Sequence, residues 1–325
     1  MPPTSQPLIF HQVVNDDGPP SEQSSPYVHS LVISLQEAGH VVSVVLPHTQ
    51  RSWIGKAHII GQTVKPTYFR PGTLHADDGT THARPSPAGS TEQEEWILVD
   101  GTPASCVQIG LYHYFHDRGP VDLVVSGPNY GRNSTAVFSL SSGTLGGALE
   151  ASICRRRAIA LSYAFFSRNH DPEIIAGASK LSVRLIDYLY KNWGEGVDLY
   201  SVNVPLVESV DTRKILWTNL LQNYWGPGSC FQEVEDADEN ADEDEERIRE
   251  TEATPPDSSS NTEIVTRHTH KHFKWAPRFA DVYKSVEEAG PGNDGWAVKE
   301  GFTRYVFCMI NSPAYTDLFF SVSHL

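Results

Sequence analysis

Short apolar runs alternate with amphipathic stretches over the first 205 residues of the chain. Leu8–Val14 and Val41–Leu46 have the length and the β-branched content of buried strands. Between them, residues 26–38 place apolar side chains at helical spacing, beginning with a proline after Ser24 or Ser25, either of which can cap a helix. The pattern predicts a strand, a helix and a second strand.

The alternation continues further along the chain. Residues 65–95 are rich in Pro, Gly, Thr and His and indicate a long excursion from it. Further strands are predicted at Trp96–Val99, Val121–Ser126, Ala158–Ser162 and Leu199–Val204, and helices at Pro103–Phe115 (capped by Thr102), 142–155 and 172–191. Such alternation is typical of a parallel sheet with crossover helices. It predicts an α/β fold with a Rossmann-like, doubly wound, mostly parallel sheet that ends near residue 205.

Negative charge is concentrated in one segment. The chain has a formal net charge of −15, and residues 233–252 contain twelve acidic residues against two arginines. A PPDSSSN stretch follows, and such a composition buries too little apolar surface to fold alone. We therefore predict a catalytic core at 1–231, an acidic disordered insertion at 232–264, and an extension at 265–325 that completes the domain and makes oligomer contacts.

Composition excludes several classes of partner. Outside the acidic segment, the one basic cluster in the catalytic-looking half is Arg155–Arg157, which is more typical of a helix end than of a nucleic-acid groove. No stretch approaches the eighteen apolar residues of a membrane helix. Four cysteines lie far apart in the sequence, which indicates neither a zinc ribbon nor a disulfide framework. We expect a cytoplasmic protein that binds neither membranes nor duplex nucleic acid.

Polar residues follow several of the predicted strands. Asn15-Asp16-Asp17-Gly18 follows the first strand, Arg51 and Ser52 follow the second, and a GPNYGRN loop follows Val121–Ser126. The carboxyl ends of parallel strands meet at one edge, so these side chains should share a crevice. Carboxylate, hydroxyl and amide oxygens favour Mg²⁺, Mn²⁺ or Ca²⁺, and the start of helix 142–155 suits an anion. Together these groups predict phosphatase chemistry.

The same segments match a known family. VVNDDG, SVVLPHTQRS, DGTPASCVQIGL, DLVVSGPNYGRN, SSGTLGGALEA and SVNVP resemble, in order and spacing, the successive motifs of the SurE family of 5′/3′-nucleotidases and acid phosphatases. FKWAPRFADV and GPGNDGWAVKEG are similar to the form found in fungal members. Six ordered motifs are far more specific than any one of them.

The resemblance implies a Rossmann-like fold, dependence on one Mg²⁺ or Mn²⁺ ion per site, and homodimers or homotetramers built partly by exchange of C-terminal elements. It also implies residue roles. The implied metal ligands are Asp16, Asp17, Ser52 and Asn129, and the implied phosphate-binding residues are Asn133, Ser142, Gly143 and Thr144. Two departures are Val14, where a small polar residue is usual, and an STAVFSL segment in place of an acidic loop. The second departure leaves the substrate contacts open.

The expected reaction is hydrolysis of nucleoside 5′-monophosphates and other small phosphate esters. Asp16 or Asp17 is expected to be catalytic, as the base for an attacking water or as a covalent nucleophile, and we favour water because metal-bound carboxylates are poorer nucleophiles. One alternative is a broad acid phosphatase with little nucleoside preference. Another is a non-catalytic nucleotide-binding or scaffold module, against which the crowded Asp16-Asp17 pair argues. A dinucleotide-binding oxidoreductase is disfavoured because GxGxxG does not follow the first strand.

Two other features have plainer interpretations. His268, His270 and His272 would share one face of a strand and would suit zinc, but no nearby acid or cysteine joins them, so a solvated or interface segment is the better prediction. The acidic run is predicted to be a solvated loop rather than a Ca²⁺-binding or docking element.

Overall fold

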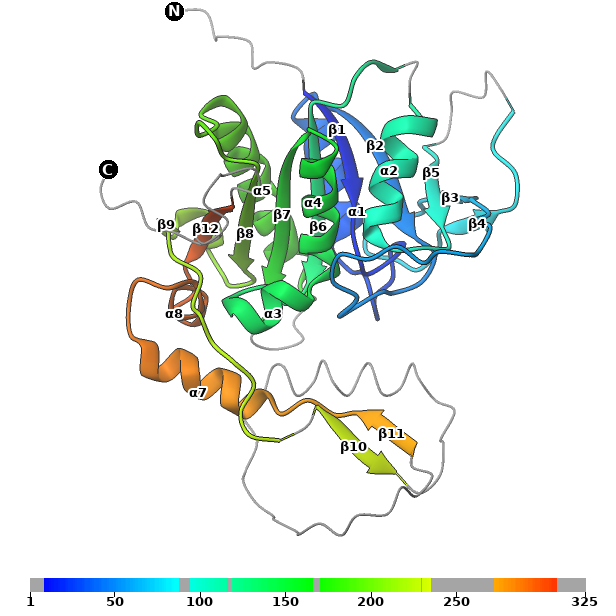
Figure 1. The fold of residues 1–325 in the computed structure, drawn as a ribbon. Coiled ribbons are helices and arrows are strands. Elements are labelled where there is room, and N and C mark those ends of the chain that lie inside the picture. The colour runs from blue at the N-terminus through cyan, green and yellow to red at the C-terminus, as the bar shows by residue number, and fades with distance from the viewer. Residues whose placement is uncertain are drawn as a thin grey trace, which may run out of the picture.

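A ten-stranded sheet runs through the computed structural model (Figure 1). The structure describes residues 9–87, 94–115, 118–165, 170–228, 230–234 and 272–308. The strands lie in the order β4-β3-β5-β2-β1-β6-β7-β8-β12-β9. Six neighbouring strands at the centre are parallel: β5 (Trp96–Val99), β2 (Val41–Pro47), β1 (Phe10–Val14), β6 (Leu123–Tyr130), β7 (Arg157–Ala164) and β8 (Leu199–Pro205). This confirms the predicted α/β fold and its mostly parallel sheet.

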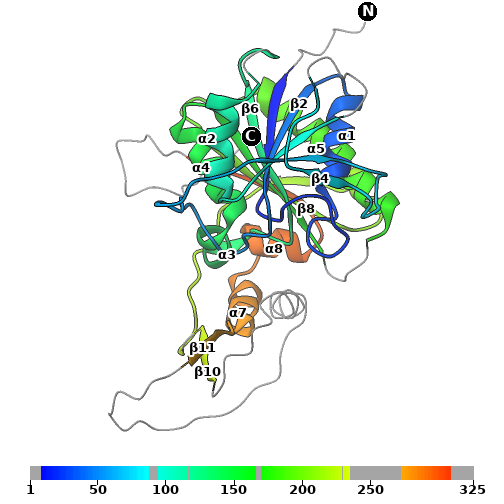
Figure 2. The ribbon, with the colours of Figure 1, turned by 90° about the vertical axis from the view of Figure 1, so that its right-hand side faces the viewer.

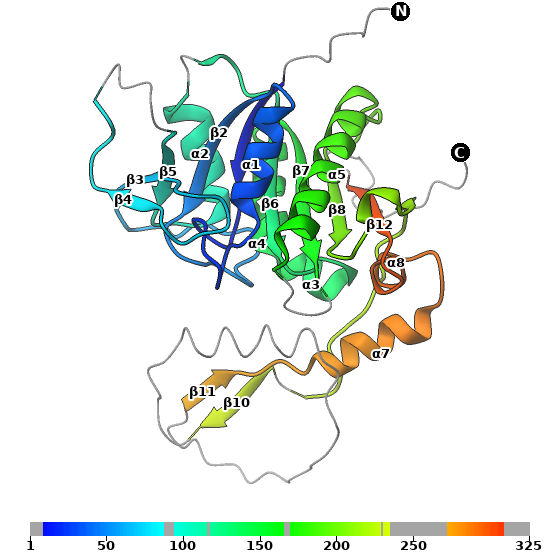
Figure 3. The same ribbon diagram turned by 180° about the vertical axis from the view of Figure 1, so that it is seen from behind.

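Helices cover both faces of the sheet, so its central strands are buried on both sides. Helices α2 (Pro103–His113) and α4 (Gly143–Ile153) cover one face, and α1 (Val28–Glu37) and α5 (Pro172–Lys191) cover the other (Figures 2 and 3). Two helix starts follow the sequence closely: Thr102 accepts a hydrogen bond from the Ser105 N–H, and Ser142 accepts one from the Leu145 N–H. These caps fix where α2 and α4 begin.

Both edges of the sheet extend beyond the predicted core. The 65–95 excursion contains β3 (Thr67–Arg70) and β4 (Thr80–His82), which pair antiparallel beside β5. At the other edge, β12 (Thr303–Cys308) pairs antiparallel with β8, and β9 (Ile215–Trp217) pairs parallel with β12. The prediction that the sheet ends near residue 205 is therefore wrong, because a strand about a hundred residues later completes it.

An arm extends from the end of the sheet where the parallel strands finish (Figure 1). It consists of the hairpin β10 (Phe231–Val234) and β11 (His272–Trp275), followed by α7 (Phe279–Ala289) and α8 (Asp294–Lys299). Aromatic rings join the arm to the core: Trp53 lies 5.6 Å from Phe279 and 5.7 Å from Trp275, centroid to centroid. The arm is thus packed beside the loop that carries Ser52.

The acidic insertion falls mostly outside the described residues. Residues 232–234, which the prediction places in the insertion, form the end of β10, while 235–264 are not described. His268 and His270 also lie outside the described residues, and His272 is an exposed residue at the start of β11. The prediction of a solvated or interface segment rather than a zinc site is therefore untested.

Two local predictions need correction. Helix α1 has Tyr27 as its N-cap without a side-chain bond, because the Ser25 hydroxyl instead donates to the Gly18 carbonyl. Strand β6 continues through Gly127, Pro128 and Asn129 to Tyr130 after a register shift, so most of the expected GPNYGRN loop is strand.

A short helix, α3 (Thr135–Ser141), occupies the STAVFSL segment, and a 3₁₀ turn (Val210–Thr212) follows β8. Among the described residues, no helix has the length and apolar character needed to cross a membrane.

Candidate active site

The turn after β1 is held in a defined shape by its own asparagine. The Asn15 Nδ2 donates to the Gly18 carbonyl over 2.9 Å and to the Ser25 Oγ over 3.2 Å, and the Gly18 N–H donates back to Asn15 Oδ1 over 3.0 Å. Gly18 has φ of +91°, a conformation that side-chain-bearing residues rarely adopt. These bonds fix the two intervening carboxylates, Asp16 and Asp17, which are 2% and 1% exposed.

Asp16 contacts the first turn of α4. Its Oδ1 accepts a hydrogen bond from the Thr144 hydroxyl over 2.5 Å. Gly143 lies so close that a Cβ built on it would be 2.8 Å from the Asp16 Cβ and 2.9 Å from Oδ2. The positive end of the helix dipole therefore faces this carboxylate, which stabilises its negative charge.

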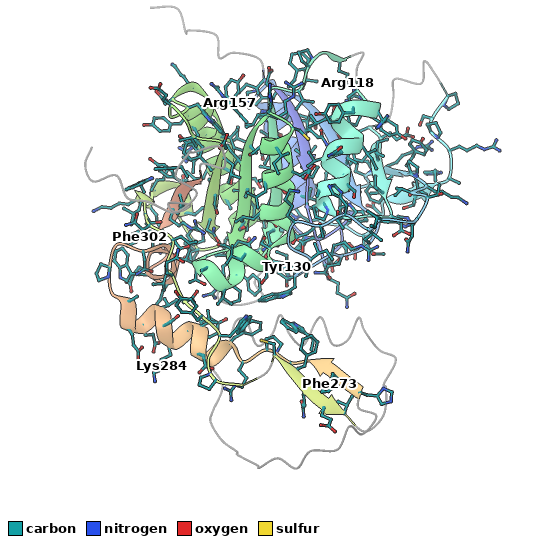
Figure 4. All side chains as sticks on the ribbon, viewed as in Figure 1. Arg118, Tyr130, Arg157, Phe273, Lys284 and Phe302 are labelled. Atoms are coloured by element: carbon teal, nitrogen blue, oxygen red, sulfur yellow. The ribbon has the colours of Figure 1, made fainter. Side chains whose placement is uncertain are left out.

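Asp17 is joined to the end of β6. Its Oδ2 accepts the backbone N–H of Tyr130 over 2.6 Å, and Figure 4 labels Tyr130 at the edge of the sheet that faces the arm. The preceding residue, Asn129, donates its Nδ2 to the Gly131 carbonyl over 2.8 Å. That bond orients the amide and leaves Oδ1 as the oxygen suited to a cation.

The loop after β2 is attached to the same turn. The Arg51 N–H donates to the Asp16 carbonyl over 2.6 Å, and the Ser52 Oγ accepts from Gln50 Nε2 over 3.1 Å. Further along the loop, the Gly55 N–H donates to the Ser141 carbonyl over 2.9 Å, just before α4. Ser52 is therefore held between the Asp16 turn and the start of α4.

An ion pair between the partly exposed Lys56 and the buried Glu150 anchors the far end of this loop. Lys56 Nζ lies 2.6 Å from Glu150 Oε2 on α4, and Gln108 Nε2 donates to Oε1 of the same carboxylate over 2.6 Å. Burial acts to raise the pKa of Glu150, but the hydrogen bonds from Gln108 and Lys56 outweigh it and the pKa is lowered. The carboxylate thus stays ionised at neutral pH and keeps Lys56 in place.

Asn133 is buried at the neighbouring strands rather than bonded to the aspartates. Its side-chain Nδ2 donates to Ser162 Oγ over 2.9 Å, and its backbone N–H donates to Asn203 Oδ1 over 2.9 Å. Its carbonyl accepts from Ser139 Oγ over 2.9 Å and from Arg304 Nη2 over 2.7 Å. These contacts connect Asn133 to β7, β8, α3 and β12.

The donor chemistry fits one divalent cation. Two adjacent, almost fully buried carboxylates repel each other unless a cation or several hydrogen-bond donors compensate their charge. The described part of the chain has no group of three or more His, Cys, Asp or Glu arranged to hold a metal. A cation site here would have two carboxylates, with Ser52 and Asn129 offering neutral oxygen donors on the neighbouring loops. Oxygen ligands of this kind suit Mg²⁺ or Mn²⁺.

The structure joins some predicted site residues directly and others through a neighbour. Asp16, Gly143 and Thr144 are in contact, and Ser142 is the cap of the same helix turn. Ser52 and Asn129 are connected through the bonds that their neighbours Arg51 and Tyr130 make to the Asp16-Asp17 turn. The sequence-based prediction missed the Tyr130 N–H, because a backbone donor has no sequence signal. It also missed Asp294 and Arg304, which pack against the Asn133 segment from far along the chain.

A mostly parallel α/β sheet with helices on both faces, whose carboxyl edge joins two buried aspartates to a helix N-terminus, defines a Rossmann-like protein. The family model described as "Survival protein SurE" matches residues 12–227, well over half of the chain. The chain therefore belongs to the SurE family.

Relatives and a solved structure agree with that family. A 5′-nucleotidase SurE from Archaeoglobus fulgidus is 28% identical over 249 residues, covering 71% of this chain and 84% of the relative. The one from Ruegeria pomeroyi is 37% identical over 156 residues, covering 46% of this chain and 58% of the relative. The crystal structure of SurE protein from Aquifex aeolicus matches 95% of this chain and 96% of its own, with a TM-score of 0.59 and 21% identity. The last match shows a common fold.

One relative has a different name. A Saccharomyces cerevisiae protein named "Probable tubulin--tyrosine ligase PBY1" is 38% identical over 260 residues, which cover 70% of this chain but 34% of the yeast protein. The chain thus spans about a third of the yeast relative and somewhat over half of the Ruegeria relative. The name of the yeast protein describes the whole of a much longer chain.

Proposed function

We propose that this protein is a divalent-metal-dependent phosphomonoesterase that hydrolyses nucleoside 5′-monophosphates and other small phosphate esters. The observation that carries the proposal is the contact between Asp16 and the first turn of α4, through Thr144 and Gly143. A cation held by the aspartates and an anion held at the helix N-terminus would then be neighbours. Phosphate-ester hydrolysis needs that combination, because charge on the phosphoryl oxygens must be stabilised as the ester bond breaks.

Each residue has a proposed role. Asp16, Asp17, Ser52 and Asn129 would hold Mg²⁺ or Mn²⁺, which supplies charge neutralisation for the phosphoryl group when bound. Ser142, Gly143 and Thr144 would bind phosphate oxygens at the helix N-terminus, with Asn133 beside them. Asp16 or Asp17 would accept a proton from the attacking water as its oxygen bonds to phosphorus and the ester oxygen leaves. Direct attack by one of these carboxylates is the alternative, and solvent ¹⁸O found in the carboxylate rather than in released phosphate alone would favour it.

A cavity beside the turn supports a nucleoside as leaving group. It has a volume of about 230 Å³ and is lined by residues that include Ser25, His29 and His170. Burial lowers the pKa of His29, so its ring is neutral at pH 7. The His170 Nε2 lies 3.3 Å from the hydroxyl of Tyr130, and the N–H of the same tyrosine donates to Asp17. The lining also includes the carboxylates of Glu22 and Asp77, so the cavity suits an uncharged, hydroxyl-bearing group such as a nucleoside better than a second anion.

Phosphate release from AMP, GMP and p-nitrophenyl phosphate tests the proposal, first with Mg²⁺ or Mn²⁺ and then with EDTA. We expect hydrolysis that requires the metal, with the nucleotides preferred. Equal rates on all three esters would favour a broad acid phosphatase. Binding of AMP without hydrolysis of any ester under any metal would favour the non-catalytic binding module.

Oligomer formation is a further proposal. Phe231 and Phe273, on the paired strands of the arm hairpin, are 52% and 60% exposed (Figure 4). Exposed aromatic rings on a projecting hairpin favour contact with a second copy of the chain. Light scattering should give a dimer or tetramer for the native protein and a smaller species for Phe231→Ser/Phe273→Ser, and a native monomer would contradict the proposal. Location in the cytoplasm also stays a prediction.

A further inference from the structure

Helix α8 and strand β12 bring a buried ion pair close to Asn133 and the Ser142 turn. Asp294 begins α8 and Arg304 lies in β12, and both side chains are 0% exposed. Arg304 Nη2 lies 3.6 Å from Asp294 Oδ2. Figures 1 and 3 place α8 beside α3, the helix that leads into the Ser142 turn. Residues about 160 positions apart in sequence are therefore neighbours here.

Arg304 holds the backbone of Asn133 together with a residue of the adjacent strand. Arg304 is paired with Asn203 in the register of β12 and β8. Arg304 Nη2 donates to the Asn133 carbonyl over 2.7 Å, and Asn203 Oδ1 accepts the Asn133 N–H over 2.9 Å. Both polar groups of one peptide segment are thus fixed by side chains from two paired strand positions. Hydrogen bonds from charged donors are about twice as strong as neutral ones, so the guanidinium contributes more than a neutral side chain would.

Asp294 holds the next turn of the same segment. Its Oδ2 accepts the Thr135 N–H over 2.7 Å, and its Oδ1 accepts the N–H groups of Leu221 and Gly295, each over 2.8 Å. Thr135 has φ of +68°, a conformation that is unfavourable for a β-branched residue. The surrounding bonds must therefore stabilise this turn. A Cβ on Gly295 would lie 3.2 Å from the Thr135 Cγ2, which indicates how closely α8 approaches it.

Residues 133–143 include the segment that this pair holds, and they have proposed phosphate-binding residues at both ends: Asn133 at one, Ser142 and Gly143 at the other. Asn133 directs its amide to Ser162, and Thr135 begins α3, which ends at Ser141 immediately before Ser142 and Gly143. A shift of residues 133–135 would move Asn133 directly and the start of α4 through α3. Asn15, Ser25 and Tyr130 hold the Asp16-Asp17 turn by other bonds. Only the bond from Thr144 to Asp16 joins this turn to the start of α4 among the bonds named above, so the turn depends on this pair less than Asn133 does.

We propose that Asp294 and Arg304 are positioning residues for phosphate: they fix Asn133 and the path into the Ser142 turn, and affect the cation ligands far less. This inference rests on the proposed function. Both side chains are fully buried, so they act through Asn133 and Thr135 rather than by touching substrate. The C-terminal segment thereby completes a site whose other residues all come from the first 144 residues.

The test compares Arg304→Lys and Asp294→Asn with the native chain in the presence of Mn²⁺. Lysine keeps the charge but has one ammonium group where arginine bonds Asn133, Ser201 and Asp294 together. Asp187→Asn is the matched control, because Asp187 Oδ1 lies 3.0 Å from the buried His40 at the opposite end of the sheet. Calorimetry measures the affinity for inorganic phosphate and, separately, for Mn²⁺, and needs no turnover.

We expect Arg304→Lys and Asp294→Asn to weaken phosphate binding by about tenfold or more, with Mn²⁺ affinity within about twofold of native and Asp187→Asn unchanged in both. Unchanged phosphate affinity in folded variants would overturn the inference, as would parallel losses of phosphate and Mn²⁺ affinity. If Asp294→Asn fails to fold, the Arg304→Lys result decides alone, and if Arg304→Lys fails to fold, the Asp294→Asn result decides. A native chain that binds Mn²⁺ and phosphate but hydrolyses no ester would refute the proposed function and leave this test intact.

Discussion

Strand β1 has buried polar side chains near both ends, and the two ends differ in the hydrogen bonds that those side chains make. Near its start, His11 is 1% exposed and both ring nitrogens lack a hydrogen-bond partner among the described residues. Just beyond its end, Asp16 and Asp17 are equally buried, but each accepts a hydrogen bond from an element that belongs to the site. Figure 4 labels Arg157 at the His11 end of the sheet and Tyr130 at the aspartate end.

The two ends also differ in whether the surroundings favour the neutral or the charged form of the buried side chain. Burial, followed by the nearby His40, lowers the pKa of His11 to about 3, so that side chain remains neutral. At the other end, the Thr144 hydroxyl at the start of α4 bonds Asp16 and the Tyr130 N–H bonds Asp17, and such donors favour the charged form of a carboxylate. Burial of polar groups alone therefore does not identify a site. The arrangement of donors around them does.

Among substitutions that leave the proposed metal ligands in place, the largest effect is expected from Gly143→Ala. The added Cβ would lie within 3.0 Å of Asp16 and of Ile54 Cγ2, so either the carboxylate or the helix start must shift. Because small misplacements of catalytic groups are costly, we expect kcat/KM for AMP to fall by about 100-fold. Gly177→Ala in α5 is the control, since its Cβ would meet a single atom at 3.6 Å. Equal, small effects of both substitutions would mean that the Asp16–α4 contact is not important for activity.

A smaller effect is expected from Thr144→Val. Valine keeps the shape but removes the hydroxyl that donates to Asp16 Oδ1, which should reduce kcat/KM by roughly tenfold to thirtyfold. Thr144→Ser retains the hydroxyl and should recover most of the activity. The measurement is steady-state kinetics on AMP with saturating Mn²⁺. Failure of serine to rescue activity would assign the loss to packing.

Glu150→Gln tests whether the loop anchor matters for the metal. It removes the ion pair with Lys56 while keeping an oxygen for Gln108. The Ser52 loop should loosen, and the Mn²⁺ concentration for half-maximal activity should rise by about fivefold. Glu95→Gln, at the partly exposed Arg70 pair, is the matched control. An unchanged Mn²⁺ requirement would show that Lys56 and Glu150 contribute stability alone.

The smallest effect on activity is expected from His11→Phe, which instead changes stability in acid. The unfolded chain protonates His11 near pH 6.5 but the folded protein near pH 3, so the unfolded state binds more protons between these values. The unfolding free energy of the native chain should therefore fall as pH drops through this range, by up to about 1.4 kcal/mol per pH unit from this residue. The variant should show a shallower fall in denaturant titrations. Parallel curves would contradict the buried neutral state.

Local sequence patterns predicted the parts of the molecule that depend on local chemistry. Thr102 and Ser142 cap the helices that follow them, and helix α5 has the predicted bounds, because caps and periodicity act within a few residues. The Asp16-Asp17 turn was identified for the same reason: its ligand-type side chains are adjacent.

Contacts between distant segments were not predictable in this way. Ser25 bonds the Gly18 turn instead of capping α1, and β6 continues past Ser126 because β7 offers it partners. Asp294 bonds Thr135, which is 159 positions away, and nothing near Asp294 in sequence indicates that partner. The residues proposed to bind the metal are thus mostly predictable from the sequence, whereas the support of those proposed to bind phosphate requires the fold.

The most direct test of the central claim is phosphate release from AMP by the native chain and by Asp16→Asn, across a Mn²⁺ titration and after EDTA. Asp122→Asn, at the other end of β1 where the carboxylate accepts the Phe10 N–H, is the control. We predict activity that EDTA abolishes and Mn²⁺ restores in the native chain and the control, and a loss of at least about 1,000-fold in folded Asp16→Asn. Activity that survives EDTA, or that survives in Asp16→Asn, would contradict a catalytic metal held by these aspartates.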